Sequence, residues 1–214
     1  MKSLSSNENY LVEYGLINSL NSSAAGRVIT KIQPFIDSQP YSSPSSYIEN
    51  LWNLALADQD FVRDVRGKGF ELMIACALIK ENILPFYWQA EISFVPMANF
   101  DLVIYTKEIG PIVLSLKTSM RERFKQAEFE AQILKNVHRR SRTFLVTMES
   151  HEAEVLAKKI DEGLVTGIEK VAVGNESSFD ELILILKNYT PIEAPKIETI
   201  VNPKIVRKNE QIGL

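Results

Sequence analysis

The sequence predicts an α/β fold in which a central mixed β-sheet is flanked by helices and preceded by a helical N-terminal region. Three observations support this class. Short apolar runs rich in β-branched and aromatic residues, typical of strands, begin at residue 87. Two of them, residues 100–106 and 112–117, flank the turn "KEIGP" and predict a hairpin. Helical and strand patterns then alternate to residue 189, and a hairpin followed by such alternation gives a mixed sheet covered by helices.

The first part of the chain is helical by its hydrophobic spacing. Residues 9–20 and 24–36 carry apolar residues at helical intervals. A loop rich in Ser and Pro follows, and it closes at a helix N-cap at Ser45 or Ser46. Two further helices, one amphipathic and one mostly apolar, are predicted before the first strand: residues 46–59 and 70–82.

The second part of the chain supplies the sheet and its outer helices. A first strand is predicted at residues 87–96, before the hairpin. The helix after the hairpin, residues 119–140, has an apolar stripe at positions 120, 124, 127, 131 and 134, which predicts that this side is buried. The remaining elements are predicted as alternating strands and helices: residues 142–149, 151–163, 167–174 and 178–189.

The chain of 214 residues fits a single domain that buries its own core. Within it we distinguish an N-terminal helical region, residues 1–66, suited to dimerisation or DNA contact, and a core at residues 67–190. The tail at residues 191–214 contains three prolines, which predict an extended segment lying along a sheet edge or a partner.

The composition indicates a protein of the reducing cytoplasm. Cys76 is the only cysteine, so a disulfide scaffold and a multi-cysteine zinc site are excluded, and its apolar neighbours predict a buried thiol. The longest uncharged apolar run, residues 72–79, is far shorter than the roughly 20 residues that span a bilayer. No apolar segment follows the first lysine, so we expect no signal peptide and no membrane partner.

Charge is distributed unevenly along the chain. The net charge of −3 does not by itself indicate a nucleic-acid partner. Residues 117–142, however, contain eight basic and three acidic side chains and carry +5, which leaves −8 on the rest. A basic patch on an acidic body favours phosphate binding, and the alternative interpretation is a solvated helix face.

Asp101 and Lys117 are the residues in which we expect chemistry. Asp101 lies at the start of the first hairpin strand and Lys117 ends the second, so the two side chains should meet at one edge of the sheet. Phosphodiester hydrolysis uses such a pair. The carboxylate holds Mg²⁺, which polarises a phosphoryl oxygen and acidifies a water molecule, while the lysine orients or deprotonates the attacking water.

An acidic residue on one strand, followed on the next by a lysine two positions after another polar residue, resembles the PD-(D/E)XK nuclease superfamily. Here Ser115 stands where most members have Asp or Glu. With Ser-x-Lys in place of the usual motif, the sequence resembles one branch of type II restriction endonucleases, the EcoRII, SsoII, PspGI and NgoMIV group. The resemblance covers residues 68–140 in outline and 114–130 in motif detail, and it implies a restriction-endonuclease-like core.

The resemblance also implies where the missing carboxylate comes from. In this branch it lies on the following helix, thirteen residues after the lysine, which is the position of Glu130. Asp101 and Glu130 would then hold Mg²⁺, with Ser115 placing water. At about 100° per residue, Glu130 falls on the shoulder of the buried stripe, from which its carboxylate can return to the sheet edge. Glu128, on the opposite shoulder, is the second choice.

Two further features transfer by position. The branch reads cytosine–guanine pairs with an Arg-Glu-Arg cluster that starts four residues after its lysine, here Arg121, Glu122 and Arg123. Arginine donates hydrogen bonds to guanine O6 and N7, and glutamate accepts one from cytosine N4.

Glu71, on the helix before the hairpin, matches a glutamate that faces the site in this fold. Its alternative interpretation is an acid in the first helical turn, favoured by the helix dipole.

The resemblance therefore implies a Mg²⁺-dependent type II restriction endonuclease, a homodimer that cuts double-stranded DNA at a short palindrome containing CC/GG. A cognate DNA methyltransferase is expected as its genetic neighbour, because a sequence-specific nuclease would otherwise cut its host. Two alternatives stay open: a repair or junction nuclease of the same fold that recognises DNA structure, and a DNA-binding module without catalytic activity.

Overall fold

The computed structural model describes residues 33, 36, 39–57, 63–96, 98–120 and 123–195. The predicted helices at 9–20 and 24–36 lie outside these residues, apart from Gln33 and Ile36. The described helices are α3 (Pro44–Ala57), α4 (Arg63–Lys80), α5 (Arg123–Val137), α6 (Ser150–Asp161) and α7 (Ser177–Leu186). The described strands are β1 (Tyr87–Ala90), β2 (Phe100–Thr106), β3 (Gly110–Lys117), β4 (Arg142–Thr147) and β5 (Ile168–Val173).

The five strands form one mixed sheet in the order β1-β2-β3-β4-β5. The β1–β2 and β2–β3 pairs are antiparallel, whereas the β3–β4 and β4–β5 pairs are parallel. The hairpin turns at residues 107–109, and Gly110 adopts a φ of 81°, a conformation that glycine reaches without strain. The predicted α/β class, the mixed sheet and the hairpin followed by alternating helices and strands are therefore confirmed.

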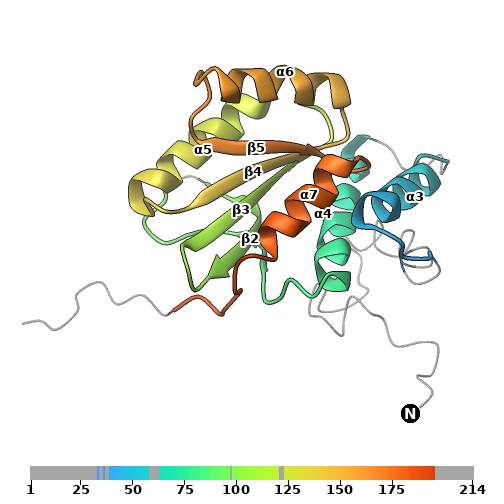
Figure 1. Ribbon diagram of the computed structural model, residues 1–214, viewed down its shortest axis with the longest axis horizontal. Coiled ribbons are helices and arrows are strands. Elements are labelled where there is room, and N and C mark those ends of the chain that lie inside the picture. The colour runs from blue at the N-terminus through green and yellow to red at the C-terminus, as the bar shows by residue number, and fades with distance from the viewer. Residues whose placement is uncertain are drawn as a thin grey trace, which may run out of the picture.

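Helices cover both faces of the sheet and make three layers (Figure 1). Helices α3, α4 and α7 pack on one face, against inward residues such as Leu102, Leu114 and Phe144. Helices α5 and α6 cover the other face, where Leu145 and Val171 are buried between them and the sheet. The predicted apolar stripe is confirmed. Ala127, Ala131 and Leu134 of α5 are buried and Phe124 is partly buried; Met120 is also buried, although it lies before the first residue of the helix, Arg123.

Helix α4 begins earlier than its sequence pattern indicates. The predicted start was residue 70, after a glycine-containing loop, but the helix already runs from Arg63 through Gly67. A glycine in a helix costs only about 1 kcal/mol, and burial of the segment from Phe70 to Ile79 outweighs that cost. Cys76 lies in this segment and is buried, as predicted. No helix in the described part of the chain has the length and apolar character needed to cross a membrane.

The sheet has a short first strand and an added edge segment. Strand β1 covers four residues instead of the ten predicted, because the chain turns after Ala90 and Phe94 has a positive φ of 67°, which is incompatible with an extended backbone. Beyond β1, the edge of β2 is paired with the tail: Thr106 bridges to Pro191, and the N–H of Ile192 donates to the carbonyl of Tyr105. The start of the tail therefore lies along a sheet edge, one of the two predicted positions.

Candidate active site

The hairpin register brings Asp101 and Lys117 together. Leu102 of β2 pairs with Leu114 of β3, so Asp101 at the start of one strand faces the end of the other. Nζ of Lys117 lies 2.9 Å from Oδ2 of Asp101, and both side chains are largely shielded, with exposed fractions of 15% and 14%. The backbone N–H of Leu116 donates to the same oxygen at 2.7 Å. A strand amide and a lysine thus hold the carboxylate in one orientation.

Glu130 joins this pair from helix α5. Burial raises the pKa of its carboxyl above the ordinary value; the hydrogen bond from Gln126 and the positive charge of Lys117 oppose that rise, and the charge of Asp101 adds to it. Glu130 therefore lies close enough to Lys117 and Asp101 for both charges to act on it. Asp101 and Lys117 are thus in contact, and Glu130 interacts with both through charge.

Ser115 contributes a buried hydroxyl on the same strand as Lys117. Its side chain is 4% exposed, and its Oγ has no hydrogen-bond partner among the described residues. A buried hydroxyl without a partner costs free energy, which a bound water molecule would recover. The predicted role of Ser115 in placing water needs such an unused hydroxyl.

The donor set fits Mg²⁺. Among the described residues, no group of three or more His, Cys, Asp or Glu side chains gathers as a complete metal cage. Mg²⁺ does not need one, because it commonly takes one or two carboxylates and completes its shell with water and phosphate oxygens. Asp101 and Glu130 provide two carboxylates, and the hydrogen bonds that Asp101 accepts from the described residues all go to Oδ2.

Glu128, the second choice for the helical carboxylate, is committed elsewhere. It accepts hydrogen bonds of 2.9–3.0 Å from the consecutive backbone N–H groups of Thr166, Gly167 and Ile168 and one of 2.7 Å from Gln132. Burial raises the pKa of Glu128, but these hydrogen bonds outweigh it, and the pKa is lowered overall. Glu128 therefore attaches α5 to the loop before β5.

Glu71 lies in the interior of α4, eight residues after Arg63, so the first-turn alternative is wrong. Its side chain is buried, and Oε2 accepts hydrogen bonds from Lys68 at 2.9 Å, Trp88 at 2.9 Å and Gln89 at 2.7 Å. These contacts connect α4 to β1. The hydrogen bonds and ion pairs of Glu71 within the described residues do not include Asp101, Lys117 or Glu130, and a role in the site stays a prediction.

Only Arg123 of the Arg121–Glu122–Arg123 cluster, which is predicted to contact DNA bases, lies within the described residues. Arg121 and Glu122 lie outside the described residues. Arg123 opens α5 and is exposed, and its backbone N–H donates to the carbonyl of Met120 at 2.6 Å. Met120 is buried beneath the helix, so Arg123 stands on a fixed first turn.

Sequence reasoning missed two groups of contacts. Gln126 donates to Glu130 Oε1 at 2.8 Å, a contact signalled by their spacing of four residues on one helix. Glu152 accepts the N–H of Met120 at 2.9 Å. Burial and its neighbour Glu152 raise the pKa of Glu149, although hydrogen bonds from Ser119 and Met120 oppose the rise. The acidic residues directly after β4 were the available signal for this second group.

Comparison of the chain with family models, with curated proteins and with solved structures finds no match.

Proposed function

We propose that this protein is a Mg²⁺-dependent nuclease of the PD-(D/E)XK type, and specifically a type II restriction endonuclease. The observation that carries the proposal is the ion pair between Lys117 and Asp101, 2.9 Å long, with Glu130 near enough to feel both charges. Two carboxylates and an ammonium group at a sheet edge are the functional groups that metal-assisted phosphodiester hydrolysis requires.

Each residue has a distinct role in this proposal. Asp101 and Glu130 hold Mg²⁺, which supplies polarisation of the phosphoryl oxygen and a more acidic water when bound. Lys117 orients the attacking water or takes its proton, and Asp101 fixes the direction of the lysine side chain. Ser115 places a water molecule with its unpaired hydroxyl. The water oxygen forms a bond to phosphorus as the bond to the leaving sugar oxygen breaks.

The proposed substrate is double-stranded DNA with a CC/GG-containing palindrome. Arg123 is exposed at the start of the helix that also carries Glu130, so base contacts and catalytic geometry share one rigid element. Arg121 and Glu122 complete the proposed reading cluster, in which arginines bond to guanine and glutamate to cytosine. A homodimer presents two such clusters related by two-fold symmetry, matching a palindrome.

A nuclease that recognises DNA structure, as in repair or junction resolution, is the second candidate. The observation in its favour is that Asp101, Lys117 and Glu130 support cleavage of any phosphodiester, whereas sequence reading rests on the cluster around Arg123. The two candidates share the metal centre and differ in what the enzyme selects.

The deciding experiment is incubation of the protein with plasmid and phage DNA in Mg²⁺, with EDTA as the control. We expect discrete fragments whose ends all fall at one CC/GG-containing sequence. A Mg²⁺-dependent smear would overturn the restriction activity and favour the second candidate. Binding without Mg²⁺-dependent cleavage would instead leave the non-catalytic DNA-binding module. A DNA methyltransferase gene beside this one would support the first reading independently.

A further inference from the structure

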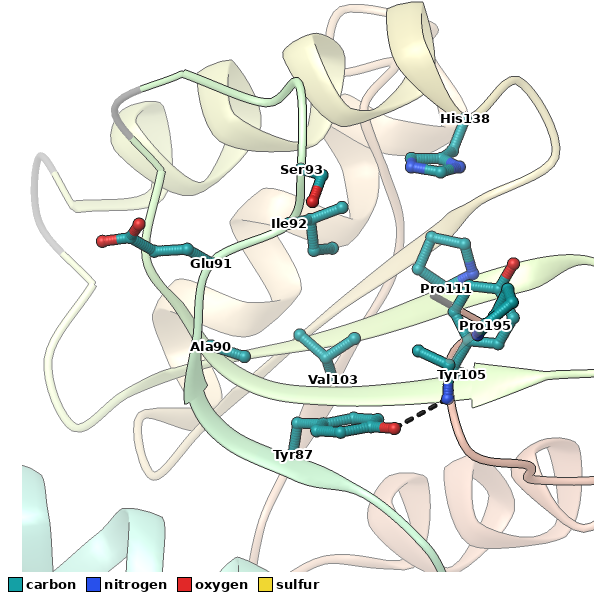
Figure 2. Close-up of a pocket in the computed structure, with 11 residues that line it drawn as sticks. Tyr87, Ala90, Glu91, Ile92, Ser93, Val103, Tyr105, Pro111, His138 and Pro195 are labelled. Carbon is teal, nitrogen blue, oxygen red and sulfur yellow. Dashed lines mark hydrogen bonds between the residues drawn. The ribbon is translucent and has the colours of Figure 1, made fainter. Parts of the chain in front are cut away.

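A pocket of about 220 Å³ lies on the α5 side of the sheet, toward the end of β2 that is farther from Asp101. Figure 2 shows it between the loop that follows β1 and the segment that follows α5, with Val103 on its floor. Tyr87, Ala90, Tyr105 and Pro111 line it, and Ala194 and Pro195 of the tail close one side. The pocket is therefore built from elements that the fold holds in place.

His138 supplies a polar group to this pocket, whose lining also includes Ser93. Its Nε2 atom is buried and has no hydrogen-bond partner among the described residues. In either neutral tautomer Nε2 is a donor or an acceptor, so burial without a partner leaves one hydrogen bond unmade. A mostly apolar cavity that offers an unused imidazole nitrogen can accept a ligand that is mostly apolar and has one polar group.

The walls restrict the ligand further. Tyr87, Tyr105 and the ring of Pro111 offer flat surfaces, which suit a planar ring. Among the residues that the structure describes, the lining contains no lysine or arginine, and Figure 2 shows the carboxylate of Glu91 pointing away from the cavity. Burying a charged ligand without an opposite charge is costly, so the ligand is uncharged. An apolar cavity of about 150 Å³ holds benzene, so this volume suits one substituted ring.

We propose that this pocket binds an uncharged, single-ring aromatic molecule whose hydrogen-bonding group pairs with Nε2 of His138. The hydrogen bond from the N–H of Ala194 to the hydroxyl oxygen of Tyr87, 2.7 Å long, keeps the tail at the rim and preserves the cavity (Figure 2). The site is separate from the proposed metal centre, and its occupation is measured without DNA or metal.

The test uses phenol and toluene as matched probes and the full chain. The sequence contains two histidines, so the imidazole ¹⁵N signals can be assigned with one variant. We expect phenol to shift the His138 signal saturably and to leave exposed His151 unchanged. His138→Phe keeps a ring but removes the nitrogen, so it should weaken phenol binding by about three- to tenfold, the value of one neutral hydrogen bond. Toluene binding should change by less than about twofold, because toluene has no hydrogen bond to lose.

Two control variants test whether binding takes place in this pocket. His151→Phe should bind both probes as the unaltered protein does, and Ala90→Leu, which adds volume within the cavity, should weaken both. No saturable shift of His138, equal shifts at both histidines, or an unchanged phenol preference in folded His138→Phe would each overturn the proposal. These readouts are independent of nuclease activity, so failure here and failure of the proposed function are distinguishable.

Discussion

Nζ of Lys117 and Oδ2 of Asp101 lie 2.9 Å apart although sixteen residues separate them in the chain. The hairpin creates this proximity, since it returns the chain to the point where the first strand begins. The same oxygen accepts the N–H of Leu116, so the pair is tied to the sheet itself. Removing either partner should therefore change chemistry more than it changes the fold.

Lys117→Ala should abolish Mg²⁺-dependent DNA cleavage while leaving DNA binding largely intact. The variant removes the group proposed to orient or deprotonate the attacking water, and proton-transfer groups contribute about 10²- to 10⁴-fold. Cleavage rate and binding affinity, measured separately, check this. Lys107→Ala, at an exposed position in the hairpin turn, is the matched control and should cleave normally. Retained cleavage by Lys117→Ala would refute the site.

Glu130→Gln and Glu128→Gln should have different consequences although the two residues share a helix. Glu130→Gln should raise the half-saturating Mg²⁺ concentration for cleavage at least about tenfold, because it removes a proposed ligand. Glu128→Gln should instead lower the free energy of unfolding by about 1–3 kcal/mol, since three backbone N–H groups lose a charged acceptor. Equal Mg²⁺ responses in both variants would contradict the assignment of Glu130.

The two glutamates should also give opposite pH dependences of stability. The pKa of Glu130 is raised above 4.5 in the folded protein, so the folded state binds its proton more tightly than the unfolded state does. Its contribution is fully present below pH 4.5 and is lost as the pH rises through the raised pKa. Glu128 has a lowered pKa, so its contribution is present above pH 4.5 and is lost as the pH falls through the lowered value. Chemical denaturation of each Gln variant against the unaltered protein, across acidic pH, measures both differences. A difference curve for Glu130→Gln with the same sign as that for Glu128→Gln would contradict this prediction.

Gly167→Ala should destabilise the protein, whereas Gly67→Ala should stabilise it. A Cβ at residue 167 would lie 2.8 Å from the carbonyl oxygen of Glu128 and 2.9 Å from Cβ of Ala131, so α5 or the loop would have to move. A Cβ at residue 67 would meet nothing within 4 Å, and alanine in a helix is favoured over glycine by about 1 kcal/mol. Thermal denaturation of both variants checks the contrast. If the two variants had equal melting temperatures, the neighbours of residue 167 would have moved aside at little cost, and the prediction would be wrong.

Arg123→Ala should reduce sequence discrimination by about 10- to 100-fold, because one good base contact contributes about 1–3 kcal/mol. Arg139→Ala, at an exposed position just after the end of α5, should leave discrimination unchanged. Cleavage of cognate and single-substitution sites gives the ratio. Uniform loss of cleavage on all sites, without a change in the ratio, would assign Arg123 to phosphate contact.

The sequence predicted most of the sheet because its strands have clear signals. The β-branched runs of β2 and β3, separated by a glycine-containing turn, determine the hairpin and hence the meeting of Asp101 with Lys117. The predicted start of α4 was wrong because Gly67 has a low helix propensity. The burial that stabilises this helix depends on elements that are distant in the sequence. The hydrogen bond from Gln126 was missed because it depends on the direction in which Glu130 points. Glu71 was named from the sequence, but its contacts with Trp88 and Gln89 were not predicted, because those partners lie on β1.

Glu128 and Glu130 lie two residues apart, one tied to the turn ahead of the last strand and the other beside the lysine. The contacts that hold α5 to the loop before β5 therefore also help to position Glu130 in the proposed centre. If the loop before β5 detached from Glu128, α5 would lose this attachment and Glu130 would be held less firmly in the proposed centre. In the proposed restriction endonuclease, such coupling would confine DNA cleavage to correctly folded molecules.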